Sequence, residues 1–364
     1  MKAIVLCLVI CASALCAADE IKIGVVGAFS GDLASYGIPT RKACEIIAKK
    51  VNDAGGIKGR KIRLITEDDS CKPEIAANVA SKIAGEKVIA VIGHICSGAT
   101  KSAVGIYRSS GIICISPSAT TPDLTGGRYP NFFRTIAPDN AQAMLVTSFT
   151  RNLKNCFRIA VLHDKGDYGK GFAEYVKRYF AEQDRGHVVL FEGVTPGAVD
   201  YTAIINKVVN LKADALVFGG YHPEASKIVA QMRKRGVTIP FISDDGVKYD
   251  TFIKVAGTYA EGVYASGPRD TTKNPLAVQA FAEHKKTYGD EAGAFYLNAY
   301  AAMTALVNAI DKAKTISYDG VSAALRGEYV DTPLGKISFD KQGDAIGVGF
   351  SMYQVVKGAY VELK

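Results

Sequence analysis

The chain has 364 residues, of which 48% are hydrophobic and 22% are charged, and these values are ordinary for a soluble globular protein. A chain of this length is long enough for two domains. The formal net charge is +8, and the lysines and arginines are spread along the chain without a block of like charge. This distribution does not indicate a nucleic-acid-binding surface, so no nucleic-acid partner is expected.

The N-terminal segment has the order of a secretory signal peptide. Lys2 is followed by an apolar run over residues 3–15 and then by small residues, which predicts cleavage near Ala18. An uncleaved membrane anchor is the alternative, but the apolar run is too short to span a bilayer easily. A lipoprotein is disfavoured because Leu15 precedes Cys16, where a small residue is normally required. No later stretch is long and apolar enough to cross a membrane, so we expect a soluble mature protein in the periplasm.

Five cysteines remain after the predicted signal peptide, at positions 44, 71, 96, 114 and 156. The oxidising compartment permits disulfides, and the odd number leaves at least one thiol outside them. Cys71 and Cys96 each follow a strand-like run, where neighbouring strand ends can bring them close. Cys44 and Cys114 lie within apolar patterns and are expected to be buried thiols. The cysteine spacings fit no zinc motif, so no metal is expected.

Strand and helix patterns alternate along the first part of the mature chain. The expected strands are short apolar runs, and the expected helices carry apolar residues three and four positions apart. The strands span residues 21–31, 61–69, 87–94 and 112–118, and the helices between them span 40–56, 73–86 and 102–111. Alternation of this kind predicts βαβ units around a parallel sheet.

The same alternation starts again in the second part of the chain. Strands are expected over 157–164, 187–193, 213–220 and 239–246, with helices such as 169–183 and 224–236 between them. The sequence therefore predicts an α/β protein with two similar, doubly wound parallel-sheet lobes.

The last part of the chain is expected to serve both lobes. A helix over residues 295–313 has a full apolar stripe and is expected to return to the first lobe, and residues 335–363 are typical of strands and turns. No flexible linker is present, so the lobes must be joined by short crossing strands, which suit a hinge.

Polar and aromatic side chains follow the expected strands, at the carboxyl ends where open parallel sheets bind ligands. In the first lobe these positions hold Ser30, Gly31, Tyr36, Ile95, Cys96, Ser97, Ser116, Ser118, Ala119 and Thr120. In the second lobe they hold Tyr168, Tyr221, His222, Glu224, Asp244 and Asp245.

This set of side chains predicts a binding site for an α-amino acid. Hydroxyls and backbone N–H groups at the start of a helix bind a carboxylate, and an aspartate pairs with an ammonium. Tyrosines add rigid apolar area with a polar tip. Enzymes of the α/β-hydrolase type need a G-x-S-x-G turn, and the nearest segments, AFSGD and YASGP, lack the first glycine at the required spacing. We therefore expect binding without catalysis and without a cofactor.

Several of these residues also have a purely structural interpretation. Ser97 is a candidate helix N-cap, and Ser118 and Thr120 lie where a turn is expected. Because Asp-Gly is a turn signal, Asp244 competes with Asp245 for the role of ammonium partner, and we favour Asp245.

The aromatic residues and histidines can also be interpreted either as ligand-binding or as purely structural residues. Tyr168 and Tyr221 lie in glycine-rich polar loops and are expected to be at least half exposed. Phe295 opens a helix and is equally interpretable as part of the core. His94 and His222 are expected to be structural, because neither has a serine and a carboxylate arranged beside it.

Seven segments of the chain resemble the leucine/isoleucine/valine-binding proteins of bacterial ABC transporters. They read, in order, KIGVVGAFSGDLASYG, GGIKGRKIRLITEDDSCKPEIAANVASK, VIGHICSGAT, ISPSATTPDLT, VLHDKGDYGKG, FGGYHPEA and GDEAGAFYLNAYAA. The resemblance covers nearly the whole mature chain, and GHICS, SPSAT and GGYHPE are its most specific motifs. It implies a type I periplasmic binding fold, in which two doubly wound lobes joined by three crossovers close over one amino acid.

The family's architecture implies how this chain is divided. Residues 1–18 are the signal peptide, residues 19–138 and 268–348 form the first lobe, and residues 139–267 and 349–364 form the second.

The resemblance also implies roles for individual residues. Ser97, Ser118, Ala119 and Thr120 are similar to the contacts for the ligand's carboxylate and backbone, and Asp245 to the partner of its ammonium. Tyr168 and Tyr221 line the second lobe's face, and the side-chain pocket is formed by Tyr36, Ile95, Cys96 and Phe295. Cys71 and Cys96 match the family's disulfide. The branched-chain members have Glu where Asp245 stands and Ala where Ser118 stands, and both differences bear on which amino acid is bound.

The expected function is capture of a branched-chain amino acid (leucine, isoleucine or valine) by hinge closure, and its delivery to the permease subunits of an ABC transporter. We expect a monomer. The alternatives are binding of another small amino acid or an amide-type ligand, a sensory ligand-binding module, and a secreted α/β enzyme. A sensory module would need a transmembrane segment that this sequence lacks after the signal peptide.

Overall fold

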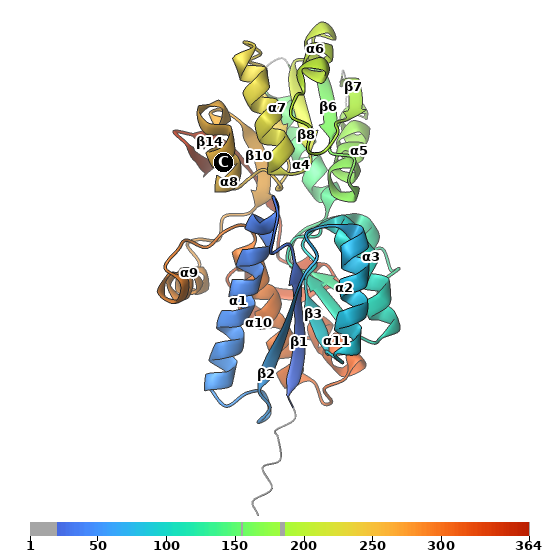
Figure 1. Ribbon diagram of the computed structural model, residues 1–364, viewed down its shortest axis with the longest axis vertical. Helices are drawn as coiled ribbons and strands as arrows, with labels where there is room; N and C mark the ends of the chain where they lie inside the picture. The colour runs from blue at the N-terminus through green and yellow to red at the C-terminus, as the bar shows by residue number, and fades with distance from the viewer. Residues whose placement is uncertain (1–19, 154–155, 183–185, 364) are drawn as a thin grey trace, which may run out of the picture.

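A computed structural model describes residues 20–153, 156–182 and 186–363 of the chain. The chain forms two α/β lobes stacked along the long axis of the molecule (Figure 1). The predicted signal peptide, residues 1–18, lies outside the described residues. Within the described part, no helix combines the length and the apolar character needed to cross a membrane.

The first lobe is built on a five-stranded sheet in which every pairing is parallel, in the order β2-β1-β3-β4-β5. The strands are β1 (Ile21–Gly27), β2 (Ile62–Asp68), β3 (Ala90–Ile92), β4 (Ile113–Ser116) and β5 (Phe132–Arg134). The helices of this lobe are α1 (Ala34–Asp53), α2 (Pro73–Gly85), α3 (Ser97–Ser109), α9 (Pro275–Tyr288), α10 (Tyr296–Lys312) and α11 (Tyr318–Gly327).

Both faces of this sheet are covered, as expected for parallel strands that are apolar along their whole length. On β1, Ile21, Ile23 and Val25 pack in a core with α1, α10 and α11. Val26 points to the opposite face, into a core with α2 and α3. The predicted return of residues 295–313 to the first lobe is confirmed, since α10 supplies much of the first core.

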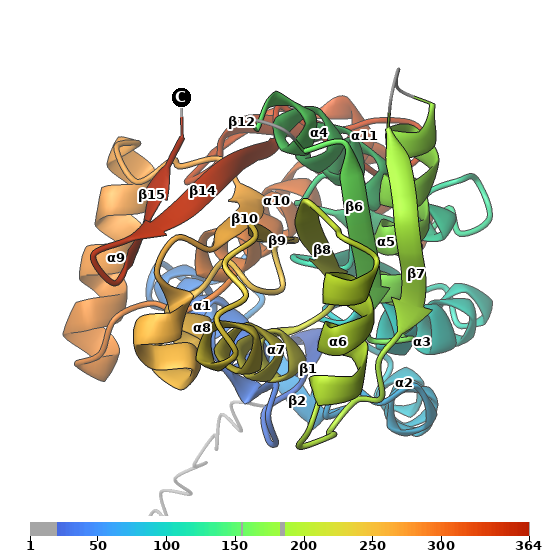
Figure 2. The same cartoon turned by 90° about the horizontal axis from the view of Figure 1, so that it is seen from above.

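The second lobe has a seven-stranded sheet in the order β15-β14-β10-β9-β8-β6-β7. Its strands are β6 (Arg158–His163), β7 (His187–Gly193), β8 (Ala215–Gly219), β9 (Phe241–Ser243), β10 (Tyr264–Pro268), β14 (Phe350–Val356) and β15 (Ala359–Glu362). Its helices are α4 (Asp139–Asn152), α5 (Asp167–Ala181), α6 (Thr202–Asn210), α7 (His222–Lys234) and α8 (Asp250–Ala256), followed by η2 (Gly257–Ala260). Viewed from above, α4 and α5 lie on one side of the sheet and α6, α7 and α8 on the other (Figure 2).

The second sheet is not parallel throughout, which corrects our expectation for this lobe. β7, β6, β8, β9 and β10 are parallel, but β14 pairs antiparallel with β10, and β15 pairs antiparallel with β14. β14 is antiparallel to β10 because it re-enters the lobe beside the residue at which β10 leaves it, Phe350 opposite Pro268. β15 then follows β14 as a hairpin, which needs only a tight turn and no crossover helix.

The chain passes between the lobes in three short segments. They are residues 135–138 between β5 and α4, 269–274 between β10 and α9, and 347–349 between β13 (Ala345–Ile346) and β14. β13 belongs to a small sheet with β11 (Val330–Thr332) and β12 (Gly335–Phe339), and η1 (Pro122–Leu124) lies between β4 and β5. Three short, ordered connections are what a hinge between two rigid lobes requires.

Two helices begin earlier than the sequence patterns predict. The first helix starts at Ala34 and continues through Pro39, so Tyr36 lies in its first turn and is fully buried. The helix expected from residue 102 starts at Ser97, with Cys96 as its N-cap residue. The extra residues of α1, ASYGIP, contain Gly37 and Pro39, which weaken a helical pattern, and those of α3, SGATK, contain no large apolar residue. Both extra turns lie at the interface between the lobes.

Candidate functional site

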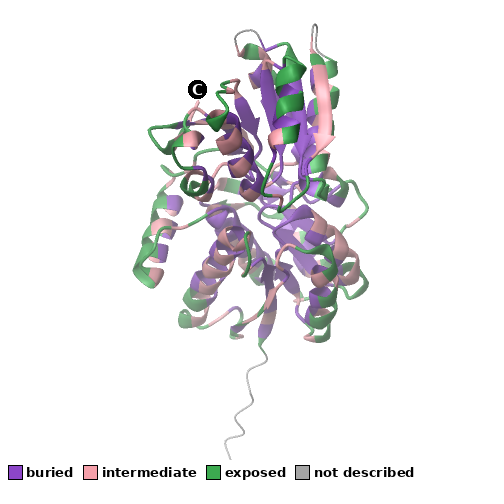
Figure 3. Ribbon diagram, turned by 45° about the horizontal axis from the view of Figure 1, so that its top comes forward, coloured by how far each residue is buried: buried purple, intermediate pink, exposed green. Residues whose placement is uncertain are grey.

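The predicted site residues meet between the lobes, around a cavity of about 10 Å³ that has room for roughly one water molecule. The cavity is lined by Tyr36, Ile95, Ser97, Ser118, Tyr168, Tyr221, Asp245, Gly246 and Phe295. The segments around it are buried where the two lobes meet (Figure 3). The structure therefore shows the two lobes closed on each other at this point.

The first lobe contributes hydroxyl groups at the ends of β3 and β4. Ser97 is the first residue of α3, and its hydroxyl accepts a hydrogen bond from the backbone N–H of Thr121 at 3.4 Å. The Ser118 hydroxyl donates to the carbonyl of Ile95 at 2.8 Å. Both side chains lie at the N-terminal end of α3, where unpaired backbone N–H groups and the helix dipole favour an anion.

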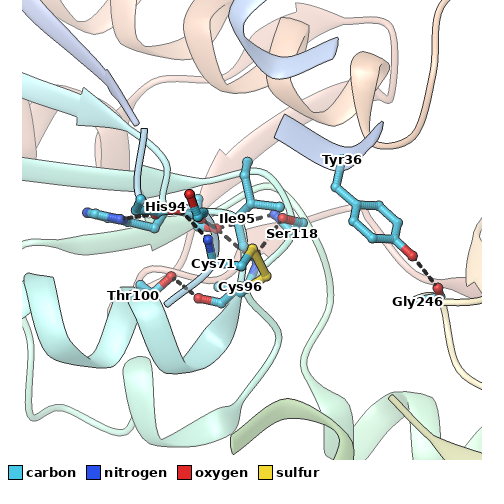
Figure 4. The surroundings of a disulfide bond; sticks show 12 residues. Tyr36, Cys71, His94, Ile95, Cys96, Thr100, Ser118 and Gly246 are labelled. Atoms are coloured by element: carbon cyan, nitrogen blue, oxygen red, sulfur yellow. Dashed lines mark hydrogen bonds and ion pairs between the residues drawn. A yellow bond between two sulfur atoms is a disulfide. The ribbon is translucent and has the colours of Figure 1, made fainter. Parts of the chain in front are cut away.

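A rigid network behind these hydroxyls holds the two strand ends in place (Figure 4). Cys71 and Cys96 form the expected disulfide, which ties the loop after β2 to the start of α3. His94 is fully buried between Asp69, at 2.5 Å from Nδ1, and the Tyr107 hydroxyl, at 2.9 Å from Nε2. With both ring nitrogens occupied by protein groups, His94 supports the loop, in line with the structural role expected from the sequence.

The second lobe contributes a buried carboxylate that faces these hydroxyls. Asp245 follows β9 and accepts hydrogen bonds from the hydroxyl of Tyr168 and, at 3.0 Å, from Nε2 of Gln142. Burial raises the pKa of Asp245 to about 6. The neighbouring Asp244 does not line the cavity, and its carboxylate accepts from the backbone N–H of Gly220 at 2.8 Å.

Asp139 is a second buried carboxylate at the site, and sequence reasoning missed it. It is the first residue of α4, directly after the first crossing segment, and is fully buried. No hydrogen bond of good geometry reaches its carboxylate oxygens, the Thr120 hydroxyl or the Oε1 atom of Gln142 from the described residues. The Thr120 hydroxyl nevertheless lies close enough to Asp139 to lower the pKa of that carboxyl. Burial and, to a smaller extent, the charge of Asp245 together raise the pKa of Asp139 to about 8.

Nothing in the sequence distinguished Asp139 from an ordinary helix start. An acidic residue in the first turn of a helix is common because it favours the helix dipole. Only its position between the two lobes could have marked Asp139 as a site residue. That position can be recognised only when the location of the first crossing segment is known.

Aromatic rings form the apolar side of the site. Tyr36 lies with its ring centroid 5.8 Å from that of Tyr221 and 5.9 Å from that of Phe295. Tyr249, which sequence reasoning also missed, packs edge-on against Phe295 at 4.9 Å. These contacts lie at spacings typical of favourable aromatic pairs.

The expected exposure of the two second-lobe tyrosines is wrong. Tyr168 is only 5% exposed, and Tyr221 is partly buried. Their loops are polar and rich in glycine, but the first lobe closes over them. Packing between lobes cannot be read from local composition.

Three of the predicted ligand contacts do not line this cavity. Cys96 and its disulfide partner Cys71 line the neighbouring groove between the lobes, which has a volume of about 720 Å³. Ala119 lies behind the cavity wall, where its carbonyl accepts a hydrogen bond from Arg134 at 3.3 Å. Thr120 is buried beside Asp139 with its hydroxyl unpartnered in the described chain.

The arrangement suits a small zwitterion better than a reacting substrate. Hydroxyls and the N-terminus of α3 face the buried carboxylate of Asp245 across the cavity, and none of its lining residues is a lysine or an arginine. Asp139 does not line the cavity and lies behind its wall, beside Thr120. Among the described residues, no group of three or more His, Cys, Asp or Glu side chains is arranged to hold a metal ion.

Comparison with known proteins gives matches over almost the entire chain. Residues 20–359 match the family described as periplasmic binding protein. The chain is 36% identical over 347 residues to the leucine-, isoleucine-, valine-, threonine- and alanine-binding protein of Pseudomonas aeruginosa, covering 94% of this chain and 92% of the relative. It is 32% identical to the Leu/Ile/Val-binding protein of Escherichia coli, covering 95% and 94%.

A solved structure shows the same fold with a ligand bound. The branched-chain amino acid transporter substrate binding protein of Streptococcus pneumoniae, in complex with isoleucine, aligns with a TM-score of 0.84 at 28% identity. The alignment covers 95% of this chain and all of that chain.

Proposed function

Because the chain belongs to the periplasmic binding protein family, we propose that it captures a branched-chain amino acid between its lobes and delivers it to an ABC permease. The observation that supports the ligand class is that the α3 N-terminus and its hydroxyls lie across one cavity from the buried carboxylate of Asp245. An α-amino acid presents the complementary charges at this spacing, and no reacting group is needed to hold it.

The two ends of the ligand have separate partners in this proposal. The carboxylate binds at the α3 N-terminus, to the Ser97 and Ser118 hydroxyls and the backbone N–H groups of that turn. The ammonium binds to Asp245, which is the only carboxylate among the cavity's lining residues. Asp139 and Thr120, behind the cavity wall, come within reach of the ammonium only if the cavity widens around the ligand.

The ligand's aliphatic side chain packs against the aromatic side of the site, formed by Tyr36, Phe295 and Tyr249 together with Ile95. Each buried CH₂ group contributes about 0.8 kcal/mol to binding. The cavity is smaller than an amino acid, so the lobes separate to admit the ligand, and the lining side chains shift to make room for it when the lobes close again. We place the lobe boundaries at residues 138/139, 267/268 and 348/349, each within or close to one of the three crossing segments.

The small cavity also favours a second candidate, a smaller amino acid such as alanine or threonine. The relative from Pseudomonas aeruginosa is named for binding these two residues as well as the branched-chain ones. Tyr36 and Phe295 would then close directly over a short side chain.

We further propose that residues 1–18 direct export and that the mature monomer acts in the periplasm, releasing its ligand chemically unchanged. The binding function is tested by isothermal titration of the mature chain with leucine, isoleucine, valine, threonine, alanine and phenylalanine. The expected result is saturable binding of at least one of the first five. No heat with any of them at millimolar concentration would refute the proposal, and a recovered ligand of altered mass would refute the absence of chemistry.

A further inference from the structure

The hydroxyl of Tyr36 spans the interface between the lobes. Tyr36 belongs to α1 of the first lobe, and its hydroxyl oxygen lies 2.6 Å from the carbonyl oxygen of Gly246, a contact drawn in Figure 4. The same oxygen lies 2.6 Å from Nδ1 of His222, the first residue of α7. Both partners belong to the second lobe, so these two contacts exist only while the lobes are closed.

Counting protons at this oxygen fixes the state of the histidine. A carbonyl oxygen can only accept, so the single hydroxyl proton of Tyr36 is donated to Gly246. The Tyr36 oxygen must therefore accept from His222, which requires a proton on Nδ1. The ring is neutral, because burial lowers the pKa of His222 to about 4. Burial also keeps the pKa of Tyr36 well above its usual value, so the hydroxyl proton is retained.

We propose that His222 is a positioning residue that, as the neutral tautomer protonated on Nδ1, fastens Tyr36 across the closed cleft and makes ligand retention weaken on acidification. This inference rests on the proposed binding function, because Tyr36 is part of the ligand's side-chain pocket. His222 itself does not line the cavity, so its effect on the ligand acts through Tyr36.

The charges that face this contact come from several elements. Asp32, in the loop before α1, favours a protonated His222, but burial of the ring has the larger effect. On the side of Tyr36, the acidic groups are Asp244 and Asp245 after β9 and Glu224 on α7. A protonated ring could still donate from Nδ1, so the contact is opposed by the burial of the imidazolium charge rather than by a lost hydrogen bond.

The direction of the pH effect follows from the two states of the cleft. With the lobes apart, His222 is free to titrate near its ordinary pKa of about 6.5, whereas closure lowers it. The closed form therefore binds fewer protons, is favoured above pH 6.5, and loses stability as the pH falls toward 4. Because the pKa of His222 is about 6.5 in the open form and about 4 in the closed form, proton linkage weakens ligand binding at pH 5.5 by up to about tenfold relative to pH 7.5.

Asp245 changes affinity in the same direction, because only its ionised form pairs with an ammonium, so the histidine must be isolated by substitution. His222→Asn keeps an N–H donor near the position of Nδ1 but removes the titration. Dissociation constants are measured by isothermal titration at pH 7.5 and 5.5 for the wild type and for H222N. His187→Asn, at an exposed site at the start of β7, is the matched control.

The expected result is that H222N binds within about threefold of the wild type at pH 7.5 and shows a pH-dependent loss that is smaller by roughly tenfold. H187N should retain the full wild-type loss. Equal losses in H222N and the wild type would overturn the proposal, as would an equal change in H187N.

A direct measurement of the tautomer makes the inference testable even if H222N fails to fold. The ¹⁵N shifts of the histidine rings should show a proton on Nδ1 and none on Nε2 of His222 at pH 7.5. The opposite tautomer would overturn the proposal. If no amino acid binds even the wild type, the proposed function fails by itself, while the tautomer in the closed protein still decides the role of His222.

Discussion

At the scale of single residues, the most informative feature of the site is a pair of buried carboxyl groups that receive few hydrogen bonds from the protein. Asp245 has two donors from the protein, whereas Asp139 has none among the described residues. Burial raises both pKa values, and the charge of Asp245 also raises that of Asp139. In the proposed binding mode, the ligand's ammonium supplies Asp245 with a further donor and favours its ionised form.

Replacing Asp245 by asparagine should weaken amino-acid binding by at least about 30-fold, because truncating one partner of a buried charge pair costs about 2 kcal/mol or more. Isothermal titration at pH 7.5 measures the change. Asp244→Asn is the matched control, since that carboxylate bonds to a backbone N–H outside the cavity wall. A larger loss in the control than in D245N would show that the assignment of the ammonium partner is wrong.

At the scale of elements, the sequence predicted the position of a site residue best where that position depends on a single strand or helix. The apolar runs that predicted strands at residues 87–94 and 112–118 do form β3 and β4. Ser97 and Ser118 follow these strands, and both hydroxyls lie at one cavity. The family resemblance correctly predicted the disulfide between Cys71 and Cys96. The start of α3 was misjudged because its first turn, SGATK, has no apolar stripe.

The site residues that the sequence did not predict are those whose position depends on contacts between elements far apart in the chain. Asp139 and Tyr249 read as ordinary helix-start residues, and only the closure of the lobes gives them a place beside the ligand site. The burial of Tyr168 has the same origin. These positions carry no local pattern, because the neighbours that bury them come from the other lobe.

The disulfide is the element-scale feature most open to test. Cys71 and Cys96 enclose a loop with a sequence separation of 25 residues, and removing them as C71S/C96S should lower the free energy of unfolding by about 3 kcal/mol. Urea denaturation of the ligand-free protein measures the difference. The wild type in reducing agent should show the same loss, and the double variant should be insensitive to that agent; equal stability of all three would contradict the expectation.

At the scale of the whole molecule, the closed state is held by few direct contacts between charged groups. Lys101 on α3 forms an ion pair of 2.8 Å with Asp167 at the start of α5, which joins the first lobe to the second. The pair lies in the wall of the large groove beside the ligand cavity. Its side chains remain partly exposed, so its contribution is modest and sensitive to salt.

Lys101→Met should weaken ligand binding by about two- to fivefold at low salt and by less at 0.5 M salt, as expected for an exposed ion pair. Lys170→Met is the control, because Lys170 lines the same groove but pairs with Glu174 on its own helix. Titration at both salt concentrations measures the effect. A loss of affinity in K101M that persists unchanged at high salt would argue against an electrostatic contact between the lobes.

The order in which the chain supplies its two sheets has a consequence for biogenesis. β14 and β15 complete the second lobe's sheet from the last residues of the chain, and α10 fills the first lobe's core from beyond residue 295. Neither half can reach its native packing while the C-terminal segment is still on the ribosome. Delayed folding of this kind would suit the export proposed above, because a translocation channel threads an unfolded chain.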